Sequence, residues 1–173
     1  MTAPLAPNTA HDDLSLQTLA RQAMAHLGRG GVIGDLLDMN ELQYEALYTV
    51  GHDLYTQARY EEASKLFGFL VMHNHLERRF IMAYAAALQM ARDYANAISL
   101  YTFASVLDLG DPLPGFHTAE CLIGLGMRNE AREGLAIVLR ECGDGHADLR
   151  ARAQALLDLL SVPLPTQPQE NAK

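Results

Sequence analysis

The residues best suited to chemistry gather in one short stretch, where His117 and Cys121 lie four residues apart with Glu120 beside them. This spacing puts two side chains on one face of a helix, so the pair could supply two zinc ligands. A zinc site needs three or four ligands, and no second pair stands at ligand spacing, since His73 and His75 belong to a different part of the chain. No nucleophile elbow or other catalytic signature is present. We therefore expect no metal, no cofactor and no enzyme activity, and a metal-dependent enzyme built on these three residues is the minor alternative.

The composition excludes several classes of protein. A chain of 173 residues suits one domain, and 49% hydrophobic residues is too many for a disordered protein. The net charge of −8 argues against nucleic acid or an anionic membrane surface as partner, because both bind proteins through clustered Lys and Arg. Two cysteines offer no disulfide framework, and the chain has neither a signal-like start nor an apolar run of about 18 residues. We expect a cytoplasmic protein.

The elements that position these residues are indicated by self-similarity at a period of 34 residues. Small residues recur in two columns, and a bulky residue follows the second column after four positions: Gly51, Ala85 and Ala119; Ala63, Ala97 and Ala131; Phe67, Tyr101 and Leu135. This is the tetratricopeptide pattern, in which antiparallel helices cross closely where both side chains are small. The predicted fold is all-α, with three tandem tetratricopeptide helix pairs in a right-handed superhelix, flanked by an N-terminal helix and a C-terminal capping helix.

The repeat register divides the chain into segments. We expect disorder at 1–10, an N-terminal helical region at 11–43 that could mediate dimerisation, repeats at 44–77, 78–111 and 112–145, a capping helix at 146–161, and a disordered tail at 162–173. The paired helices are predicted at 41–56 and 60–73, 78–91 and 94–107, and 114–125 and 128–141. Asn40 is expected to cap the first of them, and Asp12 or Asp13 the N-terminal helix. The glycines at 28, 30 and 31 should end that helix, since glycine commonly follows the last turn of a helix. The stretch lacks the phosphate-loop pattern, so we do not expect it to bind phosphate.

Function is expected on the concave face, which the first helix of each pair lines. The positions that face this side are Glu45, Tyr48, His52 and Tyr55, then Arg79, Met82, Ala86 and Gln89, then Leu113, Phe116, Glu120 and Ile123. All but Leu113 are predicted to contact a bound peptide, because aromatic residues and Met bring contact area and adaptability. Ala86 would leave room for an inserted side chain. Tyr48, Tyr55 and Met82 favour the groove over the core, whereas both locations stay open for Phe116.

Four segments also carry a resemblance to a known family. They read LYTVGHDLY at 47–55, ARYEEA at 58–63, LFGFL at 66–70 and PGFHTAEC at 114–121. From about residue 31 to residue 160 the chain resembles the class II chaperones of bacterial type III secretion. The order aromatic, His, two residues, Glu, Cys in the last segment is more specific than the general tetratricopeptide pattern.

The resemblance implies a cytoplasmic chaperone of a Gram-negative bacterium that keeps two hydrophobic translocator proteins soluble before export. An extended segment near the N-terminus of each translocator would lie in the concave groove, and the chaperone would form a homodimer through its N-terminal region. Gly115 and the longer tail depart from the family's pattern. The proline-containing stretch 163–168 could itself occupy an empty groove. The alternative is a generic tetratricopeptide scaffold, which would prefer a basic groove, whereas only Arg79 among the concave positions is basic.

Overall fold

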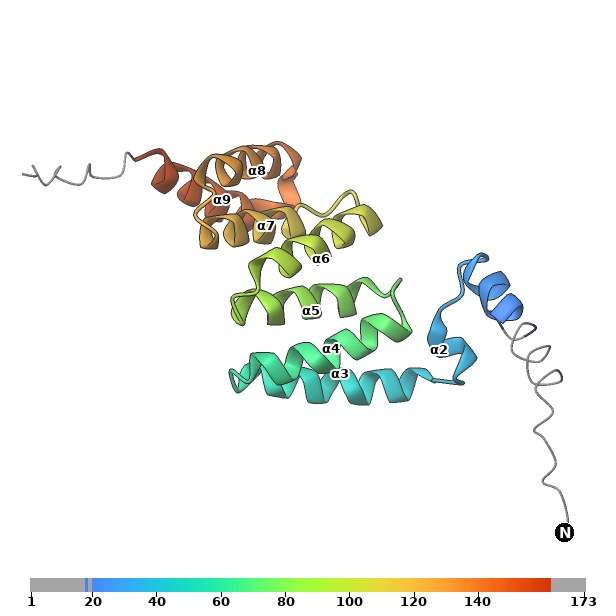
Figure 1. Ribbon diagram of the computed structural model, residues 1–173. Coiled ribbons are helices and arrows are strands. Elements are labelled where there is room, and N and C mark those ends of the chain that lie inside the picture. Colours follow the sequence, from blue (N-terminus) through green and yellow to red (C-terminus); the bar gives the residue numbers. More distant parts are fainter. Residues whose placement is uncertain (1–17, 19, 163–173) are drawn as a thin grey trace, which may run out of the picture.

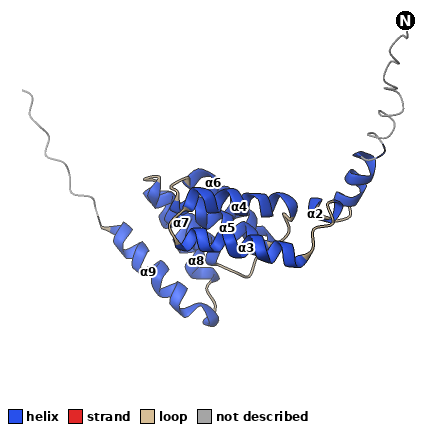
Figure 2. Ribbon diagram, turned by 90° about the horizontal axis from the view of Figure 1, so that it is seen from below, coloured by secondary structure: helices blue, strands red, loops and turns tan. Residues whose placement is uncertain are grey.

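The computed structural model describes residue 18 and residues 20–162, and within them every regular element is a helix (Figure 2). Residues 20–27 are helical and are followed by a turn at 28–30. The elements after this turn are α2 (Ile33–Leu36), α3 (Glu41–Thr56), α4 (Tyr60–His73), α5 (Arg78–Met90), α6 (Tyr94–Leu107), α7 (Leu113–Gly124), α8 (Arg128–Glu141), the 3₁₀ turn η1 (Asp144–His146) and α9 (Ala147–Ser161). The expected cap at Asp12 or Asp13, the expected disorder at 1–10 and the tail from 163 onward lie outside the described residues.

From α3 to α9 the helices stack in chain order, each packed against the next (Figure 1). Helices α3 and α4 form one end of the stack and α8 and α9 the other, while α2 lies beside α4. The first helices of neighbouring pairs also touch, α3 against α5 and α7 against α9. We call the surface over α3, α5 and α7 the groove. No helix among the described residues is long and apolar enough to cross a lipid bilayer.

The helix bounds follow the signals in the sequence. Asn40 caps α3 as predicted: its side chain accepts a hydrogen bond from the Gln43 amide at 3.0 Å, and the Gln43 side chain accepts one from the Asn40 amide at 2.9 Å. The six paired helices begin and end within one residue of the predicted positions. Helix α7 starts at Leu113 because proline is tolerated in a first turn, and the Asp111 carboxylate accepts from the Leu113 amide at 2.8 Å.

The small-residue columns lie where the helices cross. Ala63, Ala97 and Ala131 are completely buried, and so are Ala85 and Ala119 of the other column. The column of Gly51, Ala85 and Ala119 continues one period further to Ala153 on α9, which is also completely buried and shares a core cluster with Ala119. Helix α9 therefore occupies the place of the first helix of a fourth unit, which explains how it covers the last repeat.

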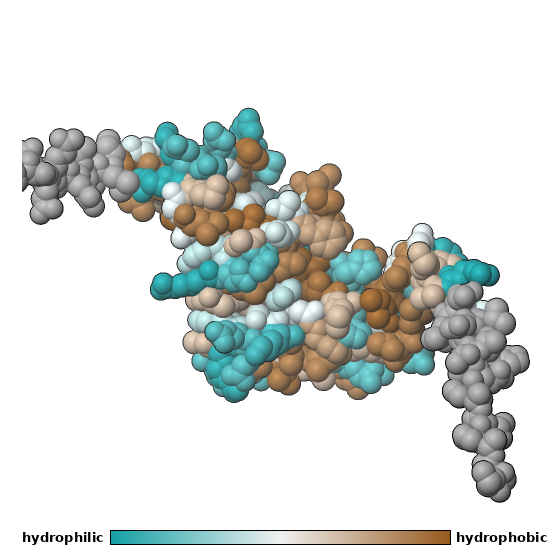
Figure 3. All heavy atoms as spheres, in the orientation of Figure 1, coloured by the Kyte–Doolittle hydropathy of each residue, from teal (hydrophilic) through white to brown (hydrophobic). Residues whose placement is uncertain are grey.

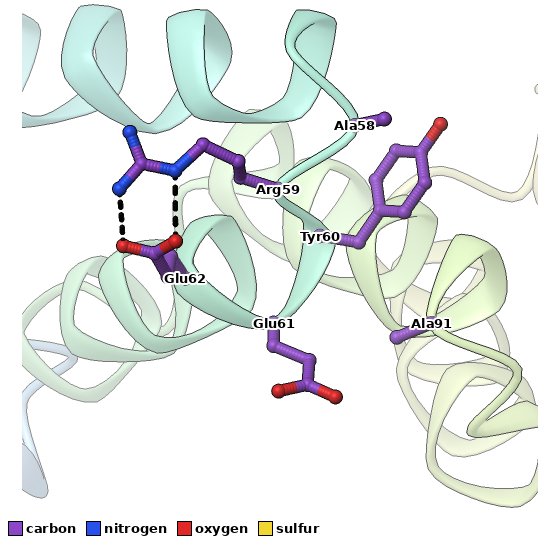
Figure 4. Close-up of a pocket in the computed structure, with 6 residues that line it drawn as sticks. All are labelled: Ala58, Arg59, Tyr60, Glu61, Glu62 and Ala91. Carbon is purple, nitrogen blue, oxygen red and sulfur yellow. Dashed lines mark hydrogen bonds and ion pairs between the residues drawn. The ribbon is translucent and has the colours of Figure 1, made fainter.

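The turns between paired helices share one backbone conformation. Ala58, Arg92 and Gly126 stand at equivalent positions and have φ angles of 59°, 65° and 78°. This left-handed conformation is strained for residues with a Cβ, and only the third turn carries glycine. A hollow of about 320 Å³ lies beside the first turn. Figure 4 shows the residues that line it, among which Arg59 pairs with Glu62, at 2.8 and 2.5 Å. Charged groups at its edge leave it poorly suited to an apolar ligand.

Candidate functional site

A cavity of about 180 Å³ lies on the groove between α3 and α5. Its lining residues are Tyr48, His52, Tyr55, Phe67, Ala83 and Ala86. The sequence predicted four of them as groove residues, and the structure brings these four together around one hollow. Phe67 comes from α4 and is almost fully buried, at 2% exposure, so it contributes an apolar surface from beneath the first helices.

The hollow exists because α5 places small residues opposite large residues of α3 and α4. Ala83 and Ala86 present only methyl groups from α5 to the aromatic residues of α3 and α4. Gly51 allows the Phe67 ring to come close, since a Cβ at this glycine would lie 2.7 Å from Phe67 Cε1. The Tyr48 and Phe67 rings pack with centroids 5.6 Å apart. Rigid aromatic walls of this kind bury area at low entropic cost.

An ion pair contacts Tyr48, one of the residues that line this cavity. Both guanidinium NH groups of Arg79 donate to the Glu45 carboxylate, one of them at 3.1 Å. The same guanidinium lies 4.6 Å from the centroid of the Tyr48 ring, a cation–π contact. The hydrogen bond from Arg79 holds the pKa of Glu45 below its usual range. Glu45 and Arg79, both predicted groove residues, thus hold each other in position, and Arg79 packs on the ring of a third predicted residue, Tyr48.

A chain of polar groups crosses from the second repeat to the third. The Tyr101 hydroxyl donates to Gln89 Oε1 at 2.7 Å, and Gln89 Nε2 donates to Glu120 Oε2 at 3.1 Å. His117 Nδ1 lies 2.8 Å from the same Glu120 oxygen. Burial opposes ionisation of Glu120, but the bonds to His117 and Gln89 outweigh it and hold the pKa of Glu120 below its usual range. Gln89 and Glu120, both predicted groove residues, therefore hold the second and third repeats together through a direct bond.

Phe116 is a core residue, which corrects its prediction as part of the peptide-binding surface. Its side chain is 1% exposed and belongs to the cluster around Ala119 and Leu135. Arg152 of α9 places its guanidinium 4.5 Å from the Phe116 ring centroid and 3.8 Å from Glu120 Oε1. Helix α9, the predicted capping helix, therefore helps to cover Phe116, for which the sequence had left both groove and core open.

Met82 and Ile123 take intermediate positions. Both are partly exposed, and each also packs against a core cluster, Met82 against the one that contains Leu88 and Ile123 against the one that contains Ala119. Their contact with a bound peptide stays a prediction.

Of the residues considered for a metal site, His117 and Glu120 contact each other, whereas Cys121 lies in the core. Cys121 is completely buried among Ala85, Ala97 and Tyr101, and this burial raises the pKa of its thiol to about 12. A thiol of this kind is a poor metal ligand, because the thiolate is the ligating form. Within the described residues, no group of three or more His, Cys, Asp or Glu side chains is arranged to hold a metal ion.

Three residues of the site escaped the sequence interpretation: Phe67, Ala83 and Arg152. Phe67 appeared there only as the bulky residue after Ala63. For Arg152 a signal existed, because the small-residue column runs on to Ala153 and so identifies α9 as a further groove-lining helix.

The stacked helix pairs and the aromatic hollow on their first helices define a tetratricopeptide-repeat protein, and residues 80–109 match the tetratricopeptide repeat family. Low calcium response locus protein H of Yersinia pestis is 30% identical over 135 residues, which cover 77% of this chain and 80% of the relative.

Two solved structures are similar as well. A T3SS complex from Aeromonas hydrophila has a TM-score of 0.75 and 32% identity, covering 81% of this chain and 95% of that chain. The Yersinia enterocolitica type III secretion chaperone SycD, in complex with a peptide of the translocator YopD, has a TM-score of 0.64 and 30% identity, covering 70% and 96%. The chain belongs to the family of low calcium response locus protein H and SycD, the type III secretion chaperones.

Proposed function

We propose that this chain is a chaperone in the cytoplasm of a Gram-negative bacterium that keeps the hydrophobic translocators of a type III secretion system soluble before export. Membership of the type III secretion chaperone family supports hydrophobic translocators as the partners. The observation that carries the proposal is the cavity lined by Tyr48, His52, Tyr55 and Ala86, because it offers an extended segment a place for an apolar side chain.

The physical need for such a chaperone follows from its partners. A pore-forming protein exposes large apolar surfaces in water and aggregates unless they are covered. Full burial of one aliphatic side chain contributes about 1.5–3 kcal/mol, so one cavity supplies part of the affinity and further contacts must add to it. The chaperone needs no chemical step, and its role is binding alone.

The proposed contact surface extends along the groove from the cavity. It comprises the residues Glu45, Tyr48, His52, Tyr55, Arg79, Met82, Ala86, Gln89, Glu120 and Ile123. Phe116 is left out because α9 and Arg152 cover it. Two translocators would use this surface in turn, each through a segment near its N-terminus.

A second copy of the chain is the proposed partner of the N-terminal region. Apolar side chains there are exposed: Met24 at 74%, together with Leu27, Ile33, Leu36 and Leu37. Figure 3 shows hydrophobic surface gathered over α2 and the neighbouring ends of α4 and α6. A homodimer would cover this surface. Sedimentation velocity on the wild type and Met24→Glu tests it: the wild type should sediment as a dimer and the variant as a monomer.

The function is tested by co-expression with each hydrophobic translocator encoded beside this chain's gene, followed by size-exclusion chromatography. Overlapping peptides from the translocator's N-terminal region are then titrated against the wild type, Tyr48→Ala and the control Phe103→Ala, whose ring is exposed on α6. We expect soluble co-elution, a loss of about 1–3 kcal/mol for Tyr48→Ala and no loss for the control. An insoluble translocator, or equal binding by both variants, would contradict the proposal.

A further inference from the structure

The third repeat and α9 together bring a hydrogen-bond acceptor and a donor close to each other on the groove. The two carboxylate oxygens of Glu120 differ in their surroundings. Oε2 has both Gln89 Nε2 and His117 Nδ1 within hydrogen-bond distance. Oε1 faces the Arg152 guanidinium at 3.8 Å, a separation too long for a hydrogen bond. Glu120 is therefore held in place through one oxygen and leaves the other open to a better donor.

Arg152 reaches this position from α9. Its guanidinium lies over the Phe116 ring, 4.5 Å from the centroid, and 56% of its side chain is exposed. Stacking on the ring orients the guanidinium plane without consuming its N–H donors, of which arginine has five. The donors that face Glu120 are not bonded to it at 3.8 Å. A group that presents an acceptor and a donor side by side can therefore bond to Arg152 and to Glu120 at the same time.

We infer that Arg152 and Glu120 form a polar subsite for the main chain of a bound extended segment, in which Arg152 donates to a backbone carbonyl and Glu120 accepts from a backbone N–H. An extended residue that pairs with a neighbouring strand exchanges both its N–H and its C=O with that neighbour. A donor and an acceptor side by side match this pattern. The inference rests on the proposed function and deepens it.

The subsite complements the cavity. The cavity lined by Tyr48 and Ala86 selects a side chain by its apolar character and size. Arg152 and Glu120 would bind groups that every residue possesses, so this part of the groove is independent of the bound sequence. The low pKa of Glu120 keeps its carboxylate ionised at neutral pH, as an acceptor requires. One groove could then hold segments from two different translocators.

The test uses the tightest-binding translocator peptide and isothermal titration calorimetry. Arg152→Met keeps an apolar chain over Phe116 but removes every donor, and Arg140→Met is the matched control on the exposed surface of α8. We expect Arg152→Met to weaken binding about 5- to 20-fold while its melting temperature stays within about 2 °C of the wild type. Arg140→Met should bind as the wild type does.

Peptide variants separate a main-chain contact from a side-chain contact. Replacing single peptide amides by esters removes the N–H and weakens the carbonyl as an acceptor. At one position the ester should weaken binding to the wild type about tenfold and to Arg152→Met less than twofold. Equal binding by Arg152→Met and the wild type overturns the inference while leaving the proposed function intact. So does a loss that follows one acidic peptide side chain and no ester. If the wild type binds no translocator peptide, the proposed function fails and the inference fails with it.

Discussion

Glu45 and Arg79 are 34 residues apart, occupy the same position in consecutive repeats, and form an ion pair across the interface between them. The Arg79 guanidinium also lies 4.6 Å from the centroid of the Tyr48 ring, which lines the cavity. The pair therefore connects the repeat spacing to the shape of the site. Its main effect should be on where Tyr48 lies, because exposed ion pairs contribute little to folding.

The first prediction concerns this pair. Glu45→Gln removes the charge that holds Arg79 over Tyr48, so the affinity for a translocator peptide should fall about two- to fivefold. The melting temperature should change little, since both side chains are 43% exposed. Calorimetric titration and thermal unfolding check the two parts. An unchanged affinity would show that the ion pair has no role in shaping the site.

The second prediction fills the cavity. Ala86→Met places a longer side chain in the hollow, so it should compete with the partner's side chain and weaken peptide binding at least about tenfold. Ala136→Met, at an exposed position of α8, is the matched control and should leave affinity unchanged. Fluorescence anisotropy with a labelled peptide measures both. Equal affinities for the two variants would place the partner's side chain elsewhere.

The third prediction separates core from groove. Phe116→Ala removes a buried ring and should lower the free energy of unfolding by about 3–5 kcal/mol. Tyr48→Ala should cost less, because Tyr48 is partly exposed on the groove. Urea denaturation followed by circular dichroism gives both values. A loss below about 1 kcal/mol for Phe116→Ala would mean that α9 does not cover this ring in solution.

The fourth prediction concerns the turns. Ala58→Gly should raise the free energy of unfolding by about 1 kcal/mol, because it removes the strain of a left-handed residue. Gly126→Ala should lower it by a similar amount at the equivalent position. Ala136→Gly is the control within a helix and should be destabilising. The same sign for Ala58→Gly and Ala136→Gly would contradict this explanation.

The sequence predicted the parts of this molecule that depend on local spacing. The 34-residue period predicted the paired helices, and Asn40 marked the start of the first one. The repeat register put Tyr48, His52, Tyr55 and Ala86 on the face where the structure has a cavity. These results need only helix geometry and the repeat rule.

The prediction for Phe116 was wrong because its exposure depends on a helix outside the three repeats. Whether a residue on α7 faces water or core is decided by how α9 packs against it, and Arg152 completes the cover. Phe67 was not recognised as a cavity residue because it reaches the hollow from the second helix of its pair. Both depend on contacts between elements, which periodicity along one helix does not describe.

The most direct test of the groove as the binding site is site-specific photo-crosslinking. A benzoylphenylalanine at position 52 would stand at the exposed edge of the cavity, and one at position 103 would stand on the outer helix α6 as the control. Each is co-expressed with the translocator, irradiated and analysed by mass spectrometry. We predict a crosslink from position 52 to one segment near the translocator's N-terminus and none from position 103. A crosslink from position 103 alone would contradict the groove as the place where the partner binds.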